Sequence, residues 1–496
     1  MVGNTIGKSS LITMNSTQRV VRGLSSQTIV TLILGILEIV SFAIMSRLLT
    51  QEDFGYYAAI SSVTAIFIAL SETGIGAAVV QRKSLDKTYI NNAFTLSFIV
   101  GLILFVILFS LSDVLANLIL DIKLGLPLRL ISVTLITHCL ASVNISILQR
   151  QLKFITIGLV NIISLVITTI VAIILALNGF GFYAILTKAV LYSVMTWIIS
   201  WVCCKARYRI ECNLVTMKSI VGFSGWLMAS ALIRDISNYL DRLTMGRILS
   251  VSALGAYNRP KEFISQINSK LNGIFDTVLF PILSDIQDDS RAIVNAFMKS
   301  LYFMNLFSSM LALAFYINSD LIIRIFFGVE WFNLLIVFKL LSISMIFNIN
   351  GRLADCYLRS LAMTKNQFCF RILQLLITIM ALVIGSHWEL VGIAASVVIS
   401  NLIMVIIKVI FIAQKIGVGV FNGLIRIIES WRILLVMFPI LAFTKSLMPD
   451  SLVSDLMLLG INVALLILIF ICFPSIVGRE YRDLLSSVMQ RMRYNQ

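Results

Sequence analysis

Charged residues, histidine and proline are all scarce in this chain. Only 13% of its 496 residues are charged, and it has two histidines and six prolines, while 59% of its residues are hydrophobic. A soluble globular protein is about 25% charged and about 45–50% apolar. Because so much apolar surface cannot be enclosed in a water-soluble core, the composition predicts a protein whose solvent is lipid. It excludes a disordered chain, a nucleic-acid-binding domain and a secreted disulfide scaffold.

The patterns that most enzymes and metal sites need are also missing. The two histidines, His138 and His387, lie far apart in the sequence, which argues against a histidine-based metal site. The seven cysteines have neither a metal-ligand spacing nor a disulfide spacing. The sequence contains no GxxxxGK[ST], GxSxG or HExxH motif. We therefore expect no catalytic residues, no metal and no cofactor.

Basic residues outnumber acidic residues in this chain. The chain has 39 Lys and Arg against 24 Asp and Glu, a net charge of +15. In a soluble protein this excess would favour nucleic acid as a partner. In a membrane protein it indicates cytoplasmic loops held by anionic lipid headgroups. We therefore expect the lipid bilayer, and no nucleic acid, as the partner of these charges.

Long apolar runs fill most of the chain. A membrane-spanning helix needs about 20 mostly apolar residues, and fourteen segments meet this requirement. They predict an all-α polytopic membrane protein with two six-helix lobes, related as parallel repeats, and two C-terminal helices. The predicted spans are 27–47, 57–80, 90–111, 127–149, 155–177, 180–203, 219–247, 257–283, 297–317, 333–357, 369–387, 391–413, 431–448 and 456–476.

The spans divide the chain into regions and suggest an orientation. With the N-terminus in the cytoplasm, 25 of the Lys and Arg fall in cytoplasmic segments and 8 in periplasmic ones, which favours cytoplasmic termini. Residues 1–25 lack the continuous apolar core and cleavage site of a signal peptide. The predicted regions are a cytoplasmic arm (1–26), an N-lobe (27–203), a cytoplasmic linker (204–218), a C-lobe (219–413), the last two spans (414–476) and a cytoplasmic tail (477–496).

An internal similarity supports the two-lobe prediction. The sequence RLLTQEDFGYY begins at Arg47, and RILSVSALGAY begins at Arg247. Arg, Leu, Gly and Tyr recur at the same offsets, although convergence of an interfacial loop would give the same pattern. Six spans separate the copies, and an even number preserves orientation. Parallel repeats of this kind enclose a cavity between two bundles that serves alternating access.

Basic residues within the spans are candidates for binding substrate. A charge at the centre of a spanning helix costs about 2.5–3.5 kcal/mol, so it usually faces a bundle interior or a wet cavity. Lys270 and Arg234 are the first candidates for contacting an anionic headgroup, with Lys188 and Arg352 behind them. The alternative is a structural ion-pair network, and Arg352 with Asp355 has the spacing of a local pair.

Acidic residues within the spans are candidates for coupling transport to an ion, and glycines and a proline are candidates for helix hinges. Glu38, Glu72 and Asp235 are candidates for coupling to H⁺ or Na⁺, although an acid can also simply balance a neighbouring base. Gly74 and Gly76 are hinge candidates in the second span, with tight helix packing as the alternative. The third hinge candidate, Pro281, is placed to end or kink the eighth span.

Four segments together resemble one known family. They are Ser71–Arg82 (SETGIGAAVVQR), the RLLT…FGYY stretch from Arg47, Val278–Asp289 with its Phe-Pro, and the Phe-Phe-Gly-x-x-Trp motif at 326–331. Their order and spacing resemble the Wzx-type polysaccharide flippases of the multidrug/oligosaccharidyl-lipid/polysaccharide exporter superfamily, and the colanic-acid exporter branch in particular. The resemblance covers about residues 25–475.

The resemblance implies a function that composition alone does not. It implies an inner-membrane flippase for undecaprenyl-pyrophosphate-linked oligosaccharide, working beside the polymerase and chain-length proteins of its pathway. It carries over no catalytic list, and Glu72 stands where the family has an Asp-like acid. The rivals are a drug/cation antiporter of the same superfamily, a membrane glycan polymerase or ligase, and a non-transporting scaffold.

Overall fold

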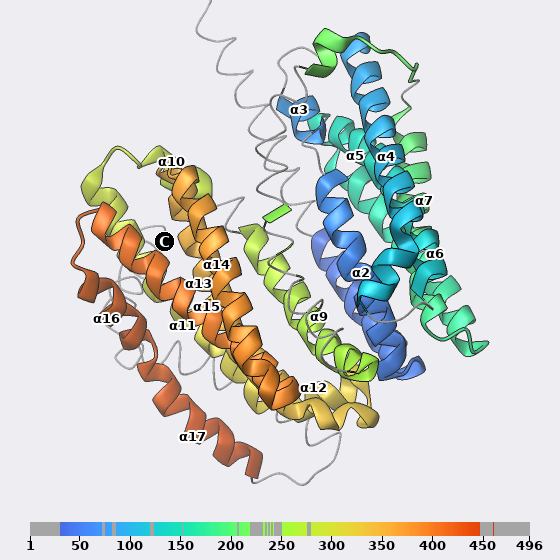
Figure 1. The fold of residues 1–496 in the computed structure, drawn as a ribbon. Coiled ribbons are helices and arrows are strands. Elements are labelled where there is room, and N and C mark those ends of the chain that lie inside the picture. The colour runs from blue at the N-terminus through green and yellow to red at the C-terminus, as the bar shows by residue number, and fades with distance from the viewer. Residues whose placement is uncertain are drawn as a thin grey trace, which may run out of the picture. The chain divides into compact units, whose positions relative to one another are not determined.

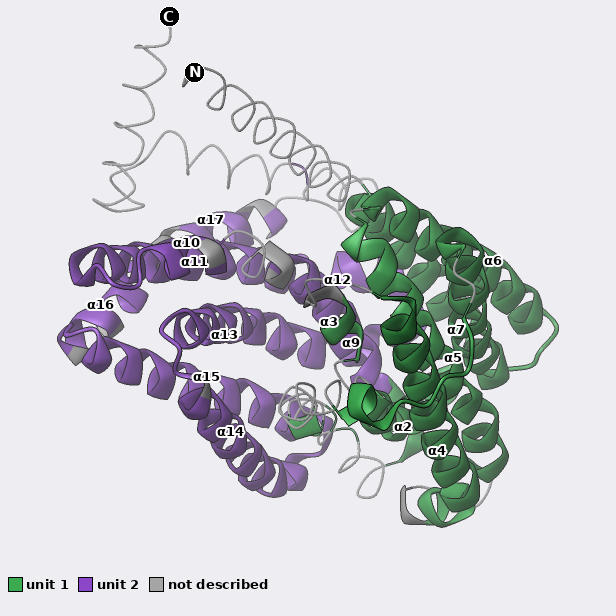
Figure 2. Cartoon of the chain, turned by 90° about the horizontal axis from the view of Figure 1, so that it is seen from above, with its two compact units in different colours: residues 1–255 green, residues 256–496 purple. Residues whose placement is uncertain are grey.

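The protein is described by a computed structural model that is helical in all its long elements (Figure 1). The described residues are 30–71, 75–81, 86–119, 124–151, 153–205, 208–218, 250–274 and 279–446, with residues 232, 233, 236, 239, 242 and 460. They form two compact units, residues 1–255 and 256–496, coloured separately in Figure 2.

The first unit is organised around one central helix. It contains the helix Val30–Leu48, then α2 (Gln51–Ser71), α3 (Ile75–Gln81), α4 (Lys87–Ile119), α5 (Gly125–Arg150), α6 (Phe154–Leu177) and α7 (Phe182–Cys204). The central helix is α5, which packs against α4, α7, α3 and α2, while α6 packs against α7.

The second unit follows the same scheme. After α9 (Val251–Ile274), whose first turn belongs to the first unit, come α10 (Phe280–Asp285), α11 (Ser290–Ile317), α12 (Ser319–Ile322) and α13 (Leu335–Ser360). They are followed by α14 (Thr364–Gly385), α15 (Glu389–Lys415), α16 (Val420–Ser430) and α17 (Arg432–Ser446). Here α13 is central and packs against α11 and α15, while α14 packs against α15. The order of packing partners therefore repeats along the chain.

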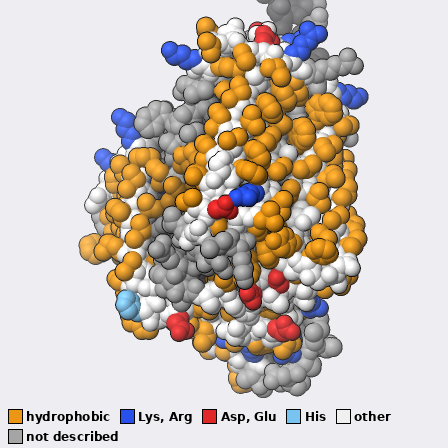
Figure 3. All heavy atoms as spheres, turned by 45° about the vertical axis from the view of Figure 1, so that its right-hand side comes forward, with side chains coloured by type: hydrophobic (Ala, Val, Ile, Leu, Met, Phe, Trp, Pro, Cys, Tyr) orange, Lys and Arg blue, Asp and Glu red, His pale blue; other side chains and the backbone are white. Residues whose placement is uncertain are grey.

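The surface is apolar and the interior holds many hydroxyl and amide groups. Figure 3 shows hydrophobic side chains covering most of the described surface on one face. Inside, Thr137 on α5 and Ser193 on α7 share a 2.6 Å hydrogen bond. An apolar surface around a partly polar interior is expected of a protein in lipid. There the hydrophobic effect does not drive helices together, and hydrogen bonds between helices help to decide which helix faces associate. The all-helical membrane fold predicted from composition is confirmed.

Nine segments of the described chain are long and apolar enough to span a membrane. The longest, Lys365–Lys415, contains α14 and α15. These two helices pack against each other around a short 3-10 turn at Ser386–Trp388, so they form a hairpin. The predicted seventh and fourteenth spans lie almost entirely outside the described residues, and the predicted region boundaries stay predictions.

The repeated sequence motif corresponds to two helix starts. At the start of α2, the amide of Asp53 donates to Thr50 Oγ1 (3.2 Å) while the amide of Thr50 donates to the Asp53 carboxylate (3.0 Å), a reciprocal cap. At the start of α9, the amide of Ala253 donates to Ser250 Oγ (3.1 Å). The Thr/Ser match in the motif is therefore a helix N-cap in both copies.

The close approach of two helices explains why the motif has a glycine at positions 55 and 255. A Cβ on Gly55 would lie 1.9 Å from the carbonyl oxygen of Val251, and a Cβ on Gly255 would lie 1.8 Å from that of Gln51. Both contacts lie within the first unit. The first turns of α2 and α9 thus approach each other too closely for any residue with a side chain, and each copy supplies the same glycine.

Some helix ends differ from the prediction. α4 extends to Ile119, well past the predicted end at 111, because an amphipathic stretch continues the helix after the hydropathy falls. α9 begins at Val251, so Pro260 lies inside the helix instead of near its start. The predicted thirteenth span, 431–448, is preceded by an additional helix, α16.

Candidate functional site

A polar cluster lies between three helices of the first unit. Lys188 Nζ on α7 donates to Ser41 Oγ on the helix Val30–Leu48. Ser41 Oγ in turn lies 3.1 Å from Thr169 Oγ1 on α6. Lys188 is half-buried and Ser41 is buried. A lysine this far along an apolar helix is stabilised only where hydroxyls or an acid replace its water shell.

The acid that accompanies this lysine is Glu38. It lies three residues before Ser41 on the same helix face, and it is half-buried. Glu38 acts electrostatically on Tyr192, which lies four residues after Lys188 on α7. The structure therefore gathers Glu38 and Lys188, which the sequence analysis assigned to two different roles, around one seam.

A second cluster, of charged residues, lies in the second unit. Asp355 on α13 is 2% exposed. Its carboxylate accepts a hydrogen bond from Lys408 Nζ on α15 (2.8 Å) and from Arg371 Nη2 on α14 (2.5 Å). Arg352, one turn earlier on α13, adds to the positive field at Asp355. We refer to Arg352, Asp355, Arg371 and Lys408 as the α13–α15 charge cluster.

The topology of the helices explains how these residues meet. Asp355 lies near the end of α13, Arg371 near the start of α14 and Lys408 near the end of α15. Since consecutive helices of a hairpin run in opposite directions, the end of one, the start of the next and the end of the third lie at the same level. The cluster carries three positive charges and one negative charge, which suits contact with an anion.

Lys408 and Arg371 are the members that sequence reasoning missed. Both lie within predicted spans (391–413 and 369–387) but were counted with the cytoplasmic charges, whereas Lys408 lies inside α15 and is buried. A signal for this was present in the sequence. Ser396, Ser400, Met404 and Lys408 recur every four residues and are all buried, so they mark the packed face of the helix.

An uncharged network links three helices of the same unit. Asn350 Nδ2 on α13 donates to Asn305 Oδ1 on α11 (2.9 Å), and Asn305 Nδ2 donates to the carbonyl oxygen of Ile427 on α16 (2.9 Å). Asn305 also donates to Ser430 Oγ at the end of α16. These asparagines are buried and hold α16 against the bundle. Sequence reasoning did not single them out because it looked for charges.

The remaining predicted site residues have different outcomes. Lys270 is an exposed residue of α9. Pro281 lies in the first turn of α10. A Cβ on Gly76 would lie 2.5 Å from Ser146 Oγ on α5, which supports the packing alternative, and the hinge at Gly76 stays a prediction. Arg234, Glu72, Asp235 and Gly74 lie outside the described residues.

Apolar helices that enclose half-buried and buried charges define a multi-pass membrane protein. A family model for polysaccharide biosynthesis proteins matches residues 44–335, and the chain belongs to that family. The chain is 24% identical over 377 residues to the lipopolysaccharide biosynthesis protein WzxC of Escherichia coli K12, which covers 75% of this chain and 76% of WzxC. It is also 24% identical over 329 residues to the teichuronic acid biosynthesis protein TuaB of Bacillus subtilis 168, covering 66% and 68% of the two chains.

Solved structures show the same fold. The lipid II flippase MurJ, in an inward closed conformation, aligns with a TM-score of 0.72 and 15% identity over 92% of this chain and 99% of MurJ. An inward-facing multidrug resistance transporter of the MATE family aligns with a TM-score of 0.62 and 15% identity, over 78% of this chain and 98% of that transporter. At these identities the likeness describes the fold alone.

Proposed function

We propose that this protein is a flippase that moves undecaprenyl-pyrophosphate-linked oligosaccharide across the inner membrane by alternating access, for assembly of a surface polysaccharide. The observation that carries the proposal is the family match over residues 44–335. Relatives named for lipopolysaccharide, teichuronic acid and succinoglycan biosynthesis support it. The fold, which is shared with a protein named as a lipid II flippase, is compatible with this proposal.

The headgroup of such a substrate carries a diphosphate, so basic residues in polar surroundings are the expected contacts. Lys188 is the described candidate in the first unit, because Ser41 already holds its ammonium in a polar seam. Arg352, with its neighbours in the α13–α15 charge cluster, is the candidate in the second. Lys270 and Arg234 complete the proposed set.

Glu38 is the coupling candidate that the contacts favour. It shares the polar cluster with Lys188 and reaches Tyr192 electrostatically. Protonation of Glu38, or Na⁺ binding to it, would change the field at Lys188 and so the affinity for an anion. Glu72 and Asp235 remain alternative coupling residues. Both termini are proposed to be cytoplasmic, and pathway enzymes that polymerise the exported unit are the proposed partners.

A direct transport assay tests the proposal. Purified protein is reconstituted in vesicles with a fluorescent polyprenyl-diphosphate oligosaccharide, and the label reaching the opposite leaflet is measured with a membrane-impermeant quencher. We expect transport by the native protein, a loss of about tenfold or more in Lys188→Met because a charge-assisted contact is removed, and native rates in the exposed control Lys153→Met.

The rival functions have their own outcomes. Drug-driven cation exchange without lipid movement would favour a drug/cation antiporter. Sugar transfer between lipid carriers by the purified protein would favour a polymerase or ligase. Either result would refute the flippase.

A further inference from the structure

The segment that follows α7 is fixed to the first unit by an ordered set of hydrogen bonds. The amides of Arg209, Glu211 and Asn213 donate to side chains on α4. Their acceptors are Asn91 Oδ1 (3.2 Å), Thr95 Oγ1 (3.1 Å) and Asn92 Oδ1 (2.7 Å), respectively. Since every second amide is held in this way, residues 208–213 run extended along α4, and residues 214–218 then form a helical turn whose Val215 amide donates to Asn213 Oδ1 (3.1 Å). We call residues 208–218 the linker strap.

The start of the linker strap is anchored most firmly. The ring of Tyr208 stacks on Phe94 of α4, with centroids 4.3 Å apart and planes at 5°. Its hydroxyl donates to Asn144 Oδ1 on α5, and Asn144 Nδ2 donates to Ser200 Oγ on α7 (3.2 Å). Burial raises the pKa of Tyr208, so the hydroxyl remains a donor throughout the physiological range.

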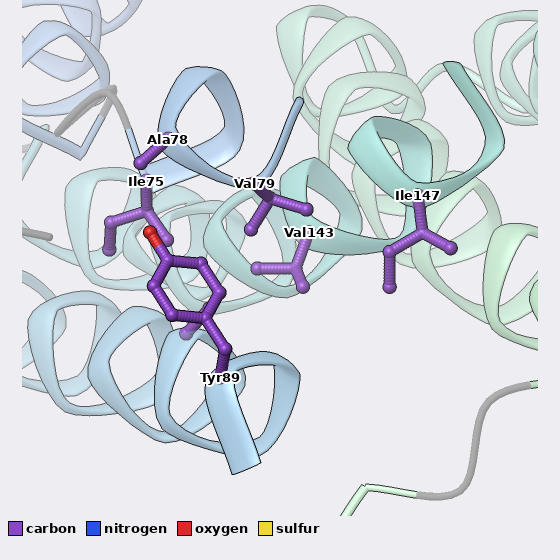
Figure 4. Packing of buried hydrophobic residues seen from close by; sticks show 7 residues of the cluster. Ile75, Ala78, Val79, Tyr89, Val143 and Ile147 are labelled. Atoms are coloured by element: carbon purple, nitrogen blue, oxygen red, sulfur yellow. The ribbon is translucent and has the colours of Figure 1, made fainter. Parts of the chain in front are cut away.

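The same anchoring covers a hydrophobic cluster. Ile75, Ala78 and Val79 of α3 pack against Tyr89 and Ala93 of α4 and against Val143 and Ile147 of α5, as Figure 4 shows for six of these residues. Tyr208 of the linker strap and Cys204 at the end of α7 pack against this cluster. These contacts hold the linker strap in one position on the first unit. The same side chains of the linker strap therefore always face away from α4 and α5.

That outward face is apolar. Ile210, Leu214 and Val215 are 78%, 80% and 81% exposed, respectively. At the C-terminal end of α7, shortly before this segment in the sequence, Trp201 and Val202 are also exposed, at 51% and 62%. Isolated exposed aliphatic residues are ordinary, but a group of them on a hydrogen-bonded segment next to a spanning helix indicates a surface with a partner.

Positive charge surrounds this apolar face. Lys205, Arg209 and Lys218 are all exposed, before, within and at the end of the linker strap. Aliphatic residues flanked by lysine and arginine, with a tryptophan at the adjoining helix end, match the boundary between lipid tails and headgroups. The charges complement anionic phospholipid headgroups, each basic residue near such a surface contributing about fivefold to binding.

We propose that the linker strap binds the surface of the bilayer, with Ile210, Leu214 and Val215 among the acyl-chain ends and Lys205, Arg209 and Lys218 on anionic phospholipid headgroups. The partner is the phospholipid membrane itself. The proposal rests on the protein being membrane-embedded and is independent of the transported substrate. Through its contacts with α4 and α5, the linker strap ties the packing of α3 to the lipid surroundings.

Spin labelling tests where the apolar face lies. Cysteine is placed at position 210 or 214 in a chain whose seven native cysteines are replaced by alanine, labelled with a nitroxide, and reconstituted in lipid nanodiscs. The exposed loop residue Asn178 is the control position. We expect labels at 210 and 214 to collide with oxygen more than with aqueous nickel chelate, by a ratio about threefold above the control. An aqueous profile equal to the control, or labels shielded from both reagents by protein, would overturn the proposal.

A lipid series tests the charges. Hydrogen exchange of residues 208–218 is compared in nanodiscs of phosphatidylcholine and of phosphatidylcholine with phosphatidylglycerol. We expect exchange about fivefold or more slower in the anionic lipid. The variant Lys205→Gln/Arg209→Gln/Lys218→Gln should lose this difference. The matched control Lys153→Gln/Lys299→Gln/Lys365→Gln, which removes three exposed lysines elsewhere, should keep it. Equal exchange in both lipids, or equal losses in both triple variants, would refute the proposal, whether or not flipping is observed.

Discussion

The α13–α15 charge cluster should respond very differently to loss of its acid and loss of one of its bases. Asp355 is its one carboxylate, and it holds Lys408 at 2.8 Å and Arg371 at 2.5 Å. Asp355→Asn leaves Lys408, whose side chain is 4% exposed, beside a neutral amide. Removing one partner of a buried ion pair costs about 3–5 kcal/mol. Lys408→Met leaves Asp355 paired with Arg371, so its cost is nearer that of one charged hydrogen bond, about 1.5–3 kcal/mol.

Thermal unfolding of purified protein in detergent measures the difference. A change of 1 kcal/mol shifts Tm by about 2–4 °C in a unit of 150–250 residues. We therefore expect Asp355→Asn to lower Tm by about 6–20 °C and Lys408→Met by about 3–12 °C. Asp320→Asn is the matched control, because Asp320 and its partner Lys445 are 29% and 35% exposed and such pairs contribute about 0–1 kcal/mol. If Lys408→Met lowers Tm as much as Asp355→Asn does, the claim that loss of the acid costs more stability than loss of one base is wrong.

Replacing Asp355 together with its two hydrogen-bonded partners, Arg371 and Lys408, separates stability from transport. Exchanging a buried ion pair or triad for apolar residues of similar volume is often neutral or stabilises by about 1–4 kcal/mol. Asp355→Leu/Arg371→Met/Lys408→Met should therefore keep the native Tm or raise it by up to about 16 °C. If the cluster contacts the diphosphate, this variant should transport at least about tenfold more slowly than native protein. Native transport rates would show that the cluster serves only to hold α13, α14 and α15 together.

Two further predictions concern the first unit. Asn92→Ala should speed hydrogen exchange of residues 208–213 by about fivefold, the value of one net hydrogen bond. The control Asn178→Ala, which removes an amide that likewise bonds to its own helix, should leave that exchange unchanged. Gly55→Ala should lower Tm by about 2–12 °C, because its Cβ would meet the Val251 carbonyl and overpacking costs about 1–3 kcal/mol. Gly158→Ala should cost less, since the three atoms nearest its Cβ are all side-chain atoms of Val30 and none is a backbone atom.

The sequence predicted the elements better than the contacts between them. Apolar runs identify spanning helices because lipid demands an uninterrupted apolar stretch, and the all-helical fold followed from them. Helix ends were less certain, as at Ile119, where hydropathy falls but the helix continues. The recurring Thr50/Ser250 and Gly55/Gly255 positions were recognised as a pattern, but their roles as cap and close approach required the backbone.

The site residues show where sequence reasoning ends. Charges within apolar runs led directly to Glu38 and Lys188, because a buried charge in lipid needs a reason. Their meeting around Ser41 depends on how three helices pack. The linker strap lies in a segment that was predicted only as a cytoplasmic linker (204–218). Its order comes from asparagines on α4, more than a hundred residues earlier, and a composition window does not register such pairings.

The two units share a packing scheme but differ in the side chains at one equivalent helix contact. α5 packs against α7 as α13 packs against α15. In the first unit this seam contains a neutral pair, Asn144 with Ser200 (3.2 Å), and in the second it contains an ionic pair, Asp355 with Lys408. Neutral amides and hydroxyls are enough to hold spanning helices together. Since the Asn144–Ser200 contact of the first unit is neutral, packing of such a seam does not by itself require an ionic pair, and transport by the variant without Asp355, Arg371 and Lys408 tests whether the charge serves the proposed contact with an anion.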